Sequence, residues 1–318
     1  MSELINNPVS AFRRSRFNLK KRKKMQILAL GGGGARGLAH VGVIKVLEEN
    51  NWYPDLITGT SIGSIVGALY AMIGNSAELE SEVTRIIQSE WFKSLDIQRI
   101  TKFTEHDAKA DLLWTIVKNI VTKWRHKSDE QSFSLLPHNF LPEIMRKIFD
   151  GVTFADLKIP FIAVATDIYS GKTVELRSGS VANAVAASSS IPGIFSPIIY
   201  KGMYLVDGFV TKNIPIPSKP VKAEKVIIAV DVQSEVGDFV PLKDPFDVIW
   251  RVEILTQRQL NKFYLDQADI VITPDMRDIH WNDFSLVEKC IRTGEYAARR
   301  YFAEGRHVMA AGYENRYV

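Results

Sequence analysis

The sequence predicts a layered α/β fold with a largely parallel central sheet. Five short apolar runs are typical of buried strands, and helix-length segments separate several of them. These runs are MQILAL, DLITG, PFIAVATDI, KVIIAVDV and DIVIT. Strands that alternate with helices favour parallel pairing, because each helix returns the chain to the starting edge of the sheet. With 318 residues and 46% hydrophobic content, the chain can bury a large core.

Residues 25–318 are expected to form one domain. The helical segment HVGVIKVLEENN follows the first strand, and SIVGALYAMIG follows the second. Residues 78–147 keep helical periodicity and interrupt the alternation, which predicts a helical insertion over one face of the sheet. The core motifs lie within residues 26–217, and residues 218–318 form the C-terminal portion. No linker rich in Pro, Ser or Gly divides these parts.

Residues 1–24 form a basic tail, which we expect to be disordered. The tail holds eight of the chain's 40 Lys and Arg side chains but only one of its 36 acids, Glu3. The remaining chain has 32 basic and 35 acidic side chains, so nothing in it predicts a nucleic-acid surface. A basic tail can bind anionic lipid, although a solvated arm is its more common role.

The location of the protein is indicated by what the sequence lacks. No apolar run reaches the ~18 residues of a transmembrane helix, and the tail lacks the apolar segment of a secretory signal. The only cysteine, Cys290, excludes an intramolecular disulfide and a cysteine-based metal cluster. We therefore expect a cytoplasmic protein.

Peripheral contact with a membrane has a second candidate besides the tail. In residues 111–124, DLLWTIVKNIVTKW, apolar side chains recur at helical spacing and lysines lie off that stripe. Such a helix can lie on a bilayer surface. An ordinary helix that buries the same stripe in the core is the alternative.

Four consecutive glycines follow the first strand, in ILALGGGGARGLAHVG. Gly32 to Gly37 read GGGARG, which satisfies the Gly-x-Gly-x-x-Gly pattern of a dinucleotide-binding turn, a weak signal on its own. Bare backbone also suits an oxyanion hole, because successive N–H groups reach a reacting carbonyl oxygen without obstruction. In that interpretation Gly33 and Gly34 are the donors. Arg36 either orients the loop or meets an anionic head group.

A second glycine motif, GTSIG, joins the strand DLITG to the helix SIVGALYAMIG. This is the Gly-x-Ser-x-Gly pattern of a nucleophile elbow, in which a tight turn exposes the serine hydroxyl. Gly59 and Gly63 let the strand and the helix approach with no Cβ between them. Ser61 then lies at a helix N-terminus, where free N–H groups favour developing negative charge. A serine that only caps the helix is the alternative.

A base for Ser61 is sought among carboxylates and histidines. In MYLVDGFVTKNIP, Asp207 ends an apolar strand before Gly208, so a partly desolvated carboxylate could accept the serine proton there. Asp167 is the rival, but the Tyr-Ser-Gly-Lys that follows it is typical of a hairpin turn. None of the histidines lies in a recognisable base motif; they are His40, His106, His126, His138, His280 and His307.

In order along the chain, these motifs resemble those of the patatin-like phospholipase family in its bacterial form. GGGARG, GTSIG and Asp207-Gly208 occur together with ATDIYSGKTVELRSGSVANAVAASSSIPGIFSPI, from Gln26 to Pro217. The segment ADIVITPDMRDIHWNDFSLVEKCIRTGEYAARR also resembles the C-terminal portion of bacterial members. Phe209 departs from the pattern, because the family's third motif usually continues with Gly or Ala. This departure puts the local backbone and the shape of the acyl pocket in question.

The resemblance implies a three-layer α/β/α fold and hydrolysis of lipid acyl esters by a Ser-Asp dyad without histidine. It implies that Ser61 is the nucleophile and Asp207 the base. It also implies that the loop carrying Gly32, Gly33, Gly34 and Gly37 forms the oxyanion hole. The expected substrate is a lipid ester. Because the sequence has no zinc or calcium-loop motif, we expect no metal and no other cofactor.

Two other classes of function are compatible with parts of the sequence. A Rossmann-type nucleotide-binding protein would use the glycine loop and needs an acidic residue about 20 positions further on, at a strand end. Glu48 and Glu49 lie nearer and in a predicted helix, and GTSIG is left without a role. A non-catalytic adaptor of the same family is the third class, which the presence of both Ser61 and Asp207 does not favour.

Overall fold

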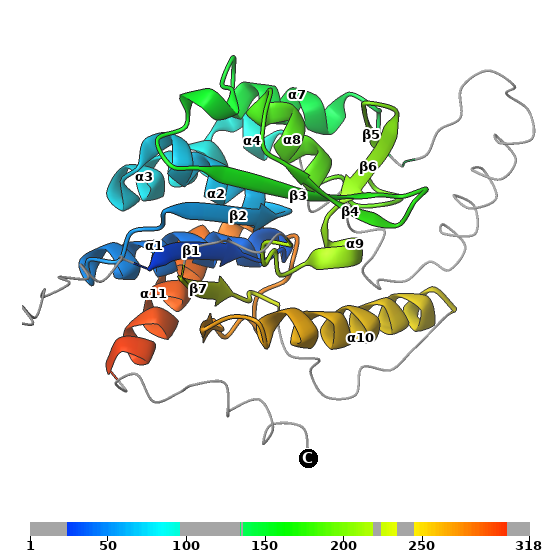
Figure 1. Cartoon of the computed structure of the whole chain (residues 1–318). Helices are drawn as coiled ribbons and strands as arrows, with labels where there is room; N and C mark the ends of the chain where they lie inside the picture. Colours follow the sequence, from blue (N-terminus) through cyan, green and yellow to red (C-terminus); the bar gives the residue numbers. More distant parts are fainter. Residues whose placement is uncertain (1–23, 96–133, 135, 219–223, 234–244, 304–318) are drawn as a thin grey trace, which may run out of the picture.

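The computed structural model describes residues 24–95, 134, 136–218, 224–233 and 245–303. These residues form the predicted α/β fold, with a mostly parallel sheet between two helical layers (Figure 1). The sheet has eight strands in the order β5-β6-β3-β2-β1-β7-β8, and β4 pairs with β3 outside this order. Strands β1, β2, β3, β7 and β8 pair in parallel, whereas β4, β5 and β6 pair antiparallel.

The apolar runs read from the sequence are strands. The strands are β1 (Met25–Leu30), β2 (Leu56–Thr60), β3 (Phe161–Asp167), β4 (Lys172–Leu176), β5 (Ile198–Tyr200), β6 (Met203–Asp207), β7 (Lys225–Val230) and β8 (Ile270–Ile272). The Tyr-Ser-Gly-Lys segment after Asp167 joins β3 to β4 as a hairpin, as predicted.

The helices cover both faces of the sheet. The α-helices are α1 (Ala39–Glu49), α2 (Ile62–Ile73), α3 (Ser76–Gln88), α4 (Glu90–Lys93), α7 (Phe140–Ile148), α8 (Val181–Ser188), α9 (Phe209–Lys212), α10 (Pro245–Leu265) and α11 (Val287–Ala303). The short 3-10 helices among the described residues are η1 (Gly34–Leu38), η3 (Phe154–Asp156) and η4 (Phe284–Leu286).

The pairing of β3 brings the carboxyl ends of two other strands together. The neighbours of β3 pair with different stretches of it: β4 with residues 163–167, β2 with 161–164 and β6 with 165–167. Because β4 overlaps both β2 and β6, it occupies one edge of β3, and β2 and β6 share the other edge. Thr60 lies opposite Val164 and Asp207 lies opposite Ala165. The strands β2 and β6 therefore meet end to end, immediately before Ser61 and at Asp207.

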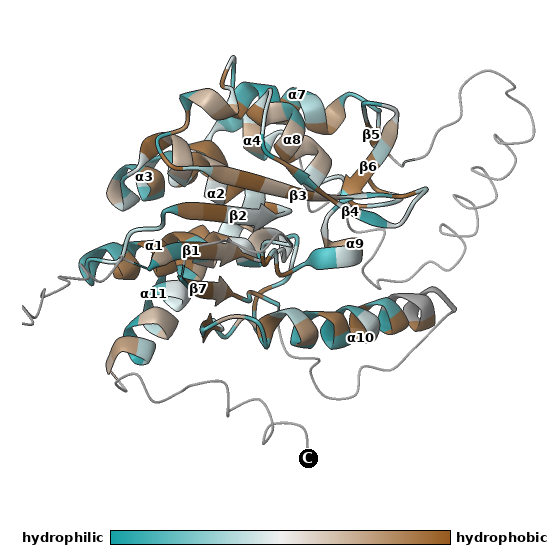
Figure 2. Cartoon of the chain, in the orientation of Figure 1, coloured by the Kyte–Doolittle hydropathy of each residue, from teal (hydrophilic) through white to brown (hydrophobic). Residues whose placement is uncertain are grey.

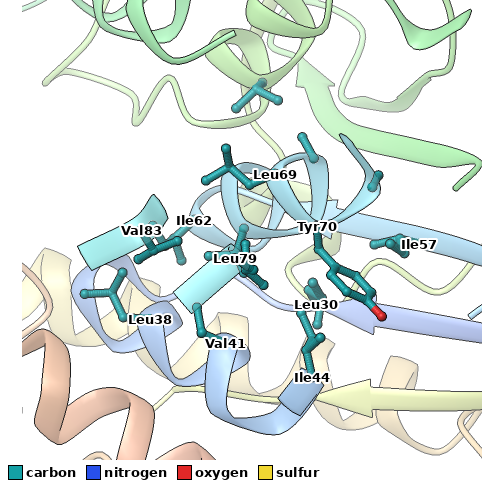
Figure 3. Packing of buried hydrophobic residues seen from close by; sticks show 14 of the residues in the cluster. Leu30, Leu38, Val41, Ile44, Ile57, Ile62, Leu69, Tyr70, Leu79 and Val83 are labelled. Atoms are coloured by element: carbon teal, nitrogen blue, oxygen red, sulfur yellow. The ribbon is translucent and has the colours of Figure 1, made fainter. Parts of the chain in front are cut away.

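Two apolar cores lie on the two faces of the sheet. Side chains of β1 alternate between them, with Leu28 and Leu30 in the larger core and Ile27 and Ala29 in the smaller one. The larger core packs α1, α2, α3, α7, α8 and α11 against the sheet, and Figure 3 shows its part between α1, α2 and α3. The smaller core is covered by the end of α10 and by residues 214–216. Figure 2 shows the strands as predominantly hydrophobic and α10 as alternating.

Several predicted segments lie outside the described residues. Helices α3, α4 and α7 fall within or overlap the predicted helical insertion at 78–147, but residues 96–133 between them are not described. The same holds for residues 1–23 of the basic tail and for the segment 111–124, whose membrane contacts stay predictions. Among the helices that the structure describes, none has the length and apolarity to cross a membrane.

Candidate active site

Ser61 occupies a strained turn between β2 and α2. Its φ of 54° and ψ of −128° are rare for a residue with a side chain, and such strain is typical of functional turns. The Ser61 N–H donates to the carbonyl oxygen and the hydroxyl oxygen of Ser188, both at 3.1 Å. The Ser61 side chain makes no capping hydrogen bond to α2. The hydroxyl is therefore not used as a helix cap.

Gly59 and Gly63 allow β2 and α2 to come into contact around this turn. A Cβ on Gly59 would lie 2.5 Å from the backbone of Gly63 and Ser64. A Cβ on Gly63 would lie 2.2 Å from the carbonyl oxygen of Leu30. Any larger residue at either position would push α2 away from the sheet and displace Ser61.

Asp207 is a fully buried carboxyl at the end of β6. Burial raises the pKa of Asp207 to about 7, although hydrogen bonding from the Ser61 hydroxyl and the Phe209 N–H opposes the shift. Oδ1 accepts a hydrogen bond from the Phe209 N–H at 2.9 Å. Oδ2 is buried and has no partner of good hydrogen-bond geometry within the described ranges. Asp207 therefore has one oxygen that no backbone N–H engages, and the Ser61 hydroxyl lies beside this carboxyl.

The glycine loop passes directly against Ser61. A Cβ on Gly32 would lie 3.1 Å from the Ser61 Cβ. The Gly32 N–H donates to Asn213 Oδ1 at 3.1 Å, and the Asn213 amide donates to the Gly32 carbonyl at 3.3 Å. In contrast, the N–H groups of Gly33 and Gly34 donate to no oxygen in the part of the chain that the structure describes. These two amides are the loop's candidates for binding an oxyanion.

The C-terminal portion of the chain holds this loop in place. The Ala35 N–H donates to the Trp281 carbonyl at 2.6 Å, and Arg36 Nε donates to the Ile279 carbonyl at 2.7 Å. Gly34 has a φ of +59°, and a Cβ there would lie 2.1 Å from the Trp281 carbonyl oxygen. Of the two roles predicted for Arg36, the contact with Ile279 supports the orientation of the loop.

Gly37 has a packing role within η1. A Cβ on Gly37 would lie 2.1 Å from the side chain of Ile62. The glycine therefore lets η1 pack against the first turn of α2, which begins one residue after Ser61.

His40 stabilises the start of the glycine loop. Its Nε2 lies 2.8 Å from the Gly31 carbonyl oxygen, and because a carbonyl only accepts, Nε2 carries the proton. Burial lowers the pKa of His40 to about 4, so the ring is neutral near pH 7. His40 thus fixes the backbone of the loop and is not placed to act as a base through this nitrogen.

An apolar cavity of about 140 Å³ reaches Ser61. It lies between α2, α3 and α7, and Ile65, Leu69, Val83, Ile144 and Ile148 are among its lining residues. Leu69 is eight residues beyond Ser61 along α2, a rise of ~12 Å. Polar lining is confined largely to Ser61 and Ser189, so the cavity suits an apolar chain that ends at Ser61.

The rival residues from the sequence have structural contacts. Asp167 accepts hydrogen bonds from the Ser170 hydroxyl and the Tyr204 N–H, and the Ser170 hydroxyl is the main cause that lowers the pKa of Asp167. Asp167 therefore stabilises the β3–β4 turn. Glu48, which a nucleotide-binding interpretation could use, accepts hydrogen bonds from the Tyr70 hydroxyl and the Ser76 N–H at the far end of α1.

Phe209 does not disturb the carboxyl that precedes it. It begins α9 with a half-buried side chain, and its N–H fixes Asp207 Oδ1. Phe209 is not among the described residues that line the Ser61 cavity. The departure from the family's Asp-Gly-Gly or Asp-Gly-Ala pattern is accommodated by the backbone.

The sequence analysis missed three residues that support the site. Asn213, Ser188 and Ser189 lie within segments quoted above, but the sequence analysis gave them no role and no periodicity points to them. Asn213 lies only six residues after Asp207 in DGFVTKN, and this short spacing is the one signal that could have found it. The Ser189 hydroxyl is buried at the cavity and has no hydrogen-bond partner within the described residues.

Comparisons with known proteins identify the family of the chain. The protein-family model for patatin-like phospholipase matches residues 28–218. Patatin-like phospholipase domain-containing protein 6 from Homo sapiens is 31% identical over 255 residues, a match that covers 79% of this chain and 16% of that protein. Lysophospholipase NTE1 from Kluyveromyces lactis is 32% identical over 227 residues, which cover 71% of this chain and 14% of that protein.

A bacterial relative matches over a larger share of its own length. An uncharacterized NTE family protein from Mycobacterium tuberculosis is 30% identical over 217 residues, which cover 68% of this chain and 51% of that protein. The chain thus spans less than a fifth of the first two relatives and about half of the third. From the family match and these identities, the chain belongs to the patatin-like phospholipase family.

Proposed function

We propose that the chain is a lipid acyl hydrolase, a carboxylic ester hydrolase with Ser61 as nucleophile and Asp207 as base. One observation carries the proposal: a buried carboxyl lies within hydrogen-bonding reach of the hydroxyl of a strained strand-to-helix turn, where an apolar cavity ends. This arrangement supplies a nucleophile, a proton acceptor and a binding site for an acyl chain.

In the first half of the reaction, Asp207 accepts the Ser61 proton as Oγ bonds to the ester carbonyl carbon. The carbonyl π electrons move to oxygen and form a tetrahedral intermediate. Its collapse breaks the bond to the leaving alcohol or lysolipid, which takes the proton from Asp207. A carboxyl with a pKa of about 7 is a stronger base than an ordinary aspartate and is substantially ionised at neutral pH.

In the second half, water attacks the acyl-enzyme with Asp207 again as base. The water's oxygen bonds to the acyl carbon while Asp207 takes one of its protons. Collapse of the second intermediate releases the fatty acid, and Ser61 Oγ recovers the proton from Asp207. Both residues return to their starting protonation states.

The negative oxygen of each intermediate is assigned to the amides of Gly33 and Gly34. Their N–H groups donate to no other oxygen within the described residues, and the loop that carries them contacts Ser61. A donor of this kind is typically worth about 10²–10³ in turnover. The positive end of the α2 dipole adds to the stabilisation, because Ser61 is the N-cap of α2.

The substrate is proposed to be a lipid ester whose acyl chain occupies the apolar cavity. The cavity walls offer almost no hydrogen-bond partners, so they favour a hydrocarbon chain over a polar head group. The names of two relatives, a phospholipase domain-containing protein and a lysophospholipase, support the same substrate class. A non-catalytic adaptor would have no need for the raised pKa of Asp207 or for the free amides beside Ser61.

Ester hydrolysis by single-residue variants tests the proposal. Ser61→Ala should abolish hydrolysis of p-nitrophenyl butyrate and labelling by a fluorophosphonate, with little change in thermal stability. Asp207→Asn should lose at least about 10² in turnover, because an amide cannot accept the proton. Turnover of the unaltered protein should rise with pH with a midpoint near 7, since only the ionised form of Asp207 is a base.

Matched controls accompany these variants. Ser170→Ala and Asp167→Asn change the same residue types in the β3–β4 turn and should keep most of the activity. Normal turnover by Ser61→Ala would contradict the proposal. A folded protein that neither hydrolyses esters nor reacts with the fluorophosphonate would favour the adaptor interpretation.

A further inference from the structure

Two hairpins at one end of the sheet carry an exposed apolar patch. We call it the hairpin patch; it consists of Ile168, Tyr169, Ile199 and Tyr204. Ile168 is 49% exposed, Tyr169 73% and Ile199 68%, while Tyr204 is half-buried beneath them. Exposed clusters of large apolar side chains commonly mark surfaces that contact a partner or a membrane.

The patch is continuous across β5, β6 and the β3–β4 turn. Ile199 of β5 lies opposite Tyr204 of β6, and the Tyr204 ring packs edge-on against the Tyr169 ring with 5.0 Å between centroids. The Ile168 N–H donates to the Tyr204 carbonyl, which ties the β3–β4 turn to β6. The side chains are thus held on a rigid framework without a further element of the described chain to cover them.

The hairpin patch lies beyond the end of the sheet at which β2 finishes and Ser61 follows. Thr60 pairs with Val164, and β3 continues three residues further to Asp167, which is ~10 Å along the strand. The β3–β4 turn with Ile168 and Tyr169 follows. Figure 1 shows both hairpins at the end of the sheet toward which the arrowhead of β2 points.

Basic side chains border the patch. Lys172 follows the β3–β4 turn and Lys201 forms the β5–β6 turn, and both are exposed. The neighbouring carboxylate of Asp167 is already engaged by the Ser170 hydroxyl and the Tyr204 N–H. Tyrosines at the head-group level, an isoleucine in the acyl boundary and lysines near anionic head groups are the usual elements of interfacial binding.

We propose that the hairpin patch docks the protein on a lipid–water interface and brings the Ser61 edge of the sheet to its substrate. The proposal rests on the proposed lipid hydrolase function, because that function requires an approach to aggregated lipid. The occupant is a lipid surface: the lysines match its phosphates, and the aromatic and aliphatic side chains match the region beneath them.

Vesicle binding by surface variants tests the docking. The full chain with Tyr169→Ser and Ile199→Ser should bind phosphatidylcholine–phosphatidylglycerol vesicles about tenfold more weakly or worse than the unaltered chain. Its melting temperature and its hydrolysis of soluble p-nitrophenyl butyrate should be retained. Tyr53→Ser is the matched control, because Tyr53 is 52% exposed and precedes the amino end of β2, at the opposite end of the strand from Ser61.

A fluorescent label identifies the surface directly. Cys290 is the only cysteine and is buried, so a cysteine introduced by Tyr169→Cys can be labelled selectively with a polarity-sensitive dye. The dye should shift to shorter wavelength on addition of these vesicles, whereas the same dye after Tyr53→Cys should not.

Three results would overturn the docking proposal: no vesicle binding by the unaltered chain, equal binding by the double variant, or bound vesicles without a shift at position 169. A separate variant, Val252→Ser with Leu255→Ser, alters an exposed apolar stripe of α10. If this variant lost vesicle binding and the hairpin-patch variant did not, the docking proposal would also be overturned. Failure of the hydrolase proposal would look different. In that case the unaltered chain would not hydrolyse the soluble ester but would still bind vesicles.

Discussion

At the scale of single residues, the burial of Asp207 favours the proposed reaction at a cost to stability. The carboxyl is fully buried and accepts only one backbone hydrogen bond, so its ionised form is poorly solvated. The same burial raises the pKa of Asp207 to about 7 and makes it a stronger base. Asp167 lies on the neighbouring strand, two positions beyond the residue opposite Asp207. It shows the reverse shift, because hydrogen bonds to its carboxylate lower its pKa.

These opposite shifts predict opposite effects of pH on stability. The folded-state pKa of Asp207 is about 7 and its ordinary value is 3.8, so the folded protein binds this proton more tightly than the unfolded chain. The Asp207 contribution therefore lowers stability as pH rises from about 4 to about 7. Asp207→Asn should raise the free energy of unfolding at pH 8, by up to about 4 kcal/mol, and should have little effect at pH 4.

Denaturant unfolding at pH 4 and pH 8 measures this difference. Asp167→Asn is the control of opposite sign: the lowered pKa of Asp167 stabilises the folded protein above its ordinary pKa, so this variant should be less stable at pH 8. If Asp207→Asn were less stable than the unaltered protein at pH 8, the buried charge could not be the cause proposed here.

At the scale of elements, α2 and α7 limit the cavity in which we propose that the acyl chain binds. Phe140 at the start of α7 stacks on Phe195, in the segment that follows Ser189 near the active site, and Ile148 lies at the other end of α7. Leu69 likewise lies two turns of α2 away from Ser61. An engineered cavity of ~150 Å³ holds one benzene molecule, so a cavity of about 140 Å³ has room for roughly six carbons.

A larger side chain at the far end should shorten the acyl chain that the protein accepts. Ile148→Phe is expected to lower kcat/KM for p-nitrophenyl octanoate several-fold while leaving the acetate and butyrate esters nearly unchanged. Ile148 is half-buried, so overpacking should cost no more than about 1–3 kcal/mol. Ile73→Phe is the control, because Ile73 is half-buried against the same core but does not line the described cavity. An equal loss on all three esters would argue against a chain-length limit at Ile148.

The elements that local sequence determines were predictable, and those set by long-range pairing were not. The strand runs, the turn at Ser61 and the hairpin after Asp167 follow from apolar patterning and glycine placement. The end-to-end meeting of β2 and β6 depends on the register of both along β3, which no local pattern encodes. The hydrogen bond from the Gly32 N–H to Asn213 Oδ1 was missed for the same reason, since these residues are 181 positions apart.

At the scale of the whole molecule, the two ends of the described chain are joined at the glycine loop. The family model matches residues 28–218, yet β7, which pairs with β1, and the segment that carries Ile279 and Trp281 lie beyond it. α11 packs closely on α1, and a Cβ on Gly294 would lie 2.0 Å from the Ala39 carbonyl oxygen. The C-terminal portion is therefore part of the framework that positions the loop.

The contact between the glycine loop and the C-terminal portion predicts that Arg36 affects turnover through the position of the loop. Arg36→Gln removes the Nε donor to the Ile279 carbonyl, a contact between residues 243 positions apart, and should let the loop beside Ser61 shift. A small displacement of catalytic groups can cost up to about 10² in rate, so kcat for p-nitrophenyl butyrate should fall about tenfold with KM nearly constant. Arg85→Gln is the control, because Arg85 is an exposed residue of α3 paired with Glu82. A raised KM for phospholipid with unchanged kcat would instead assign Arg36 to the anionic head group, the other role that the sequence allowed.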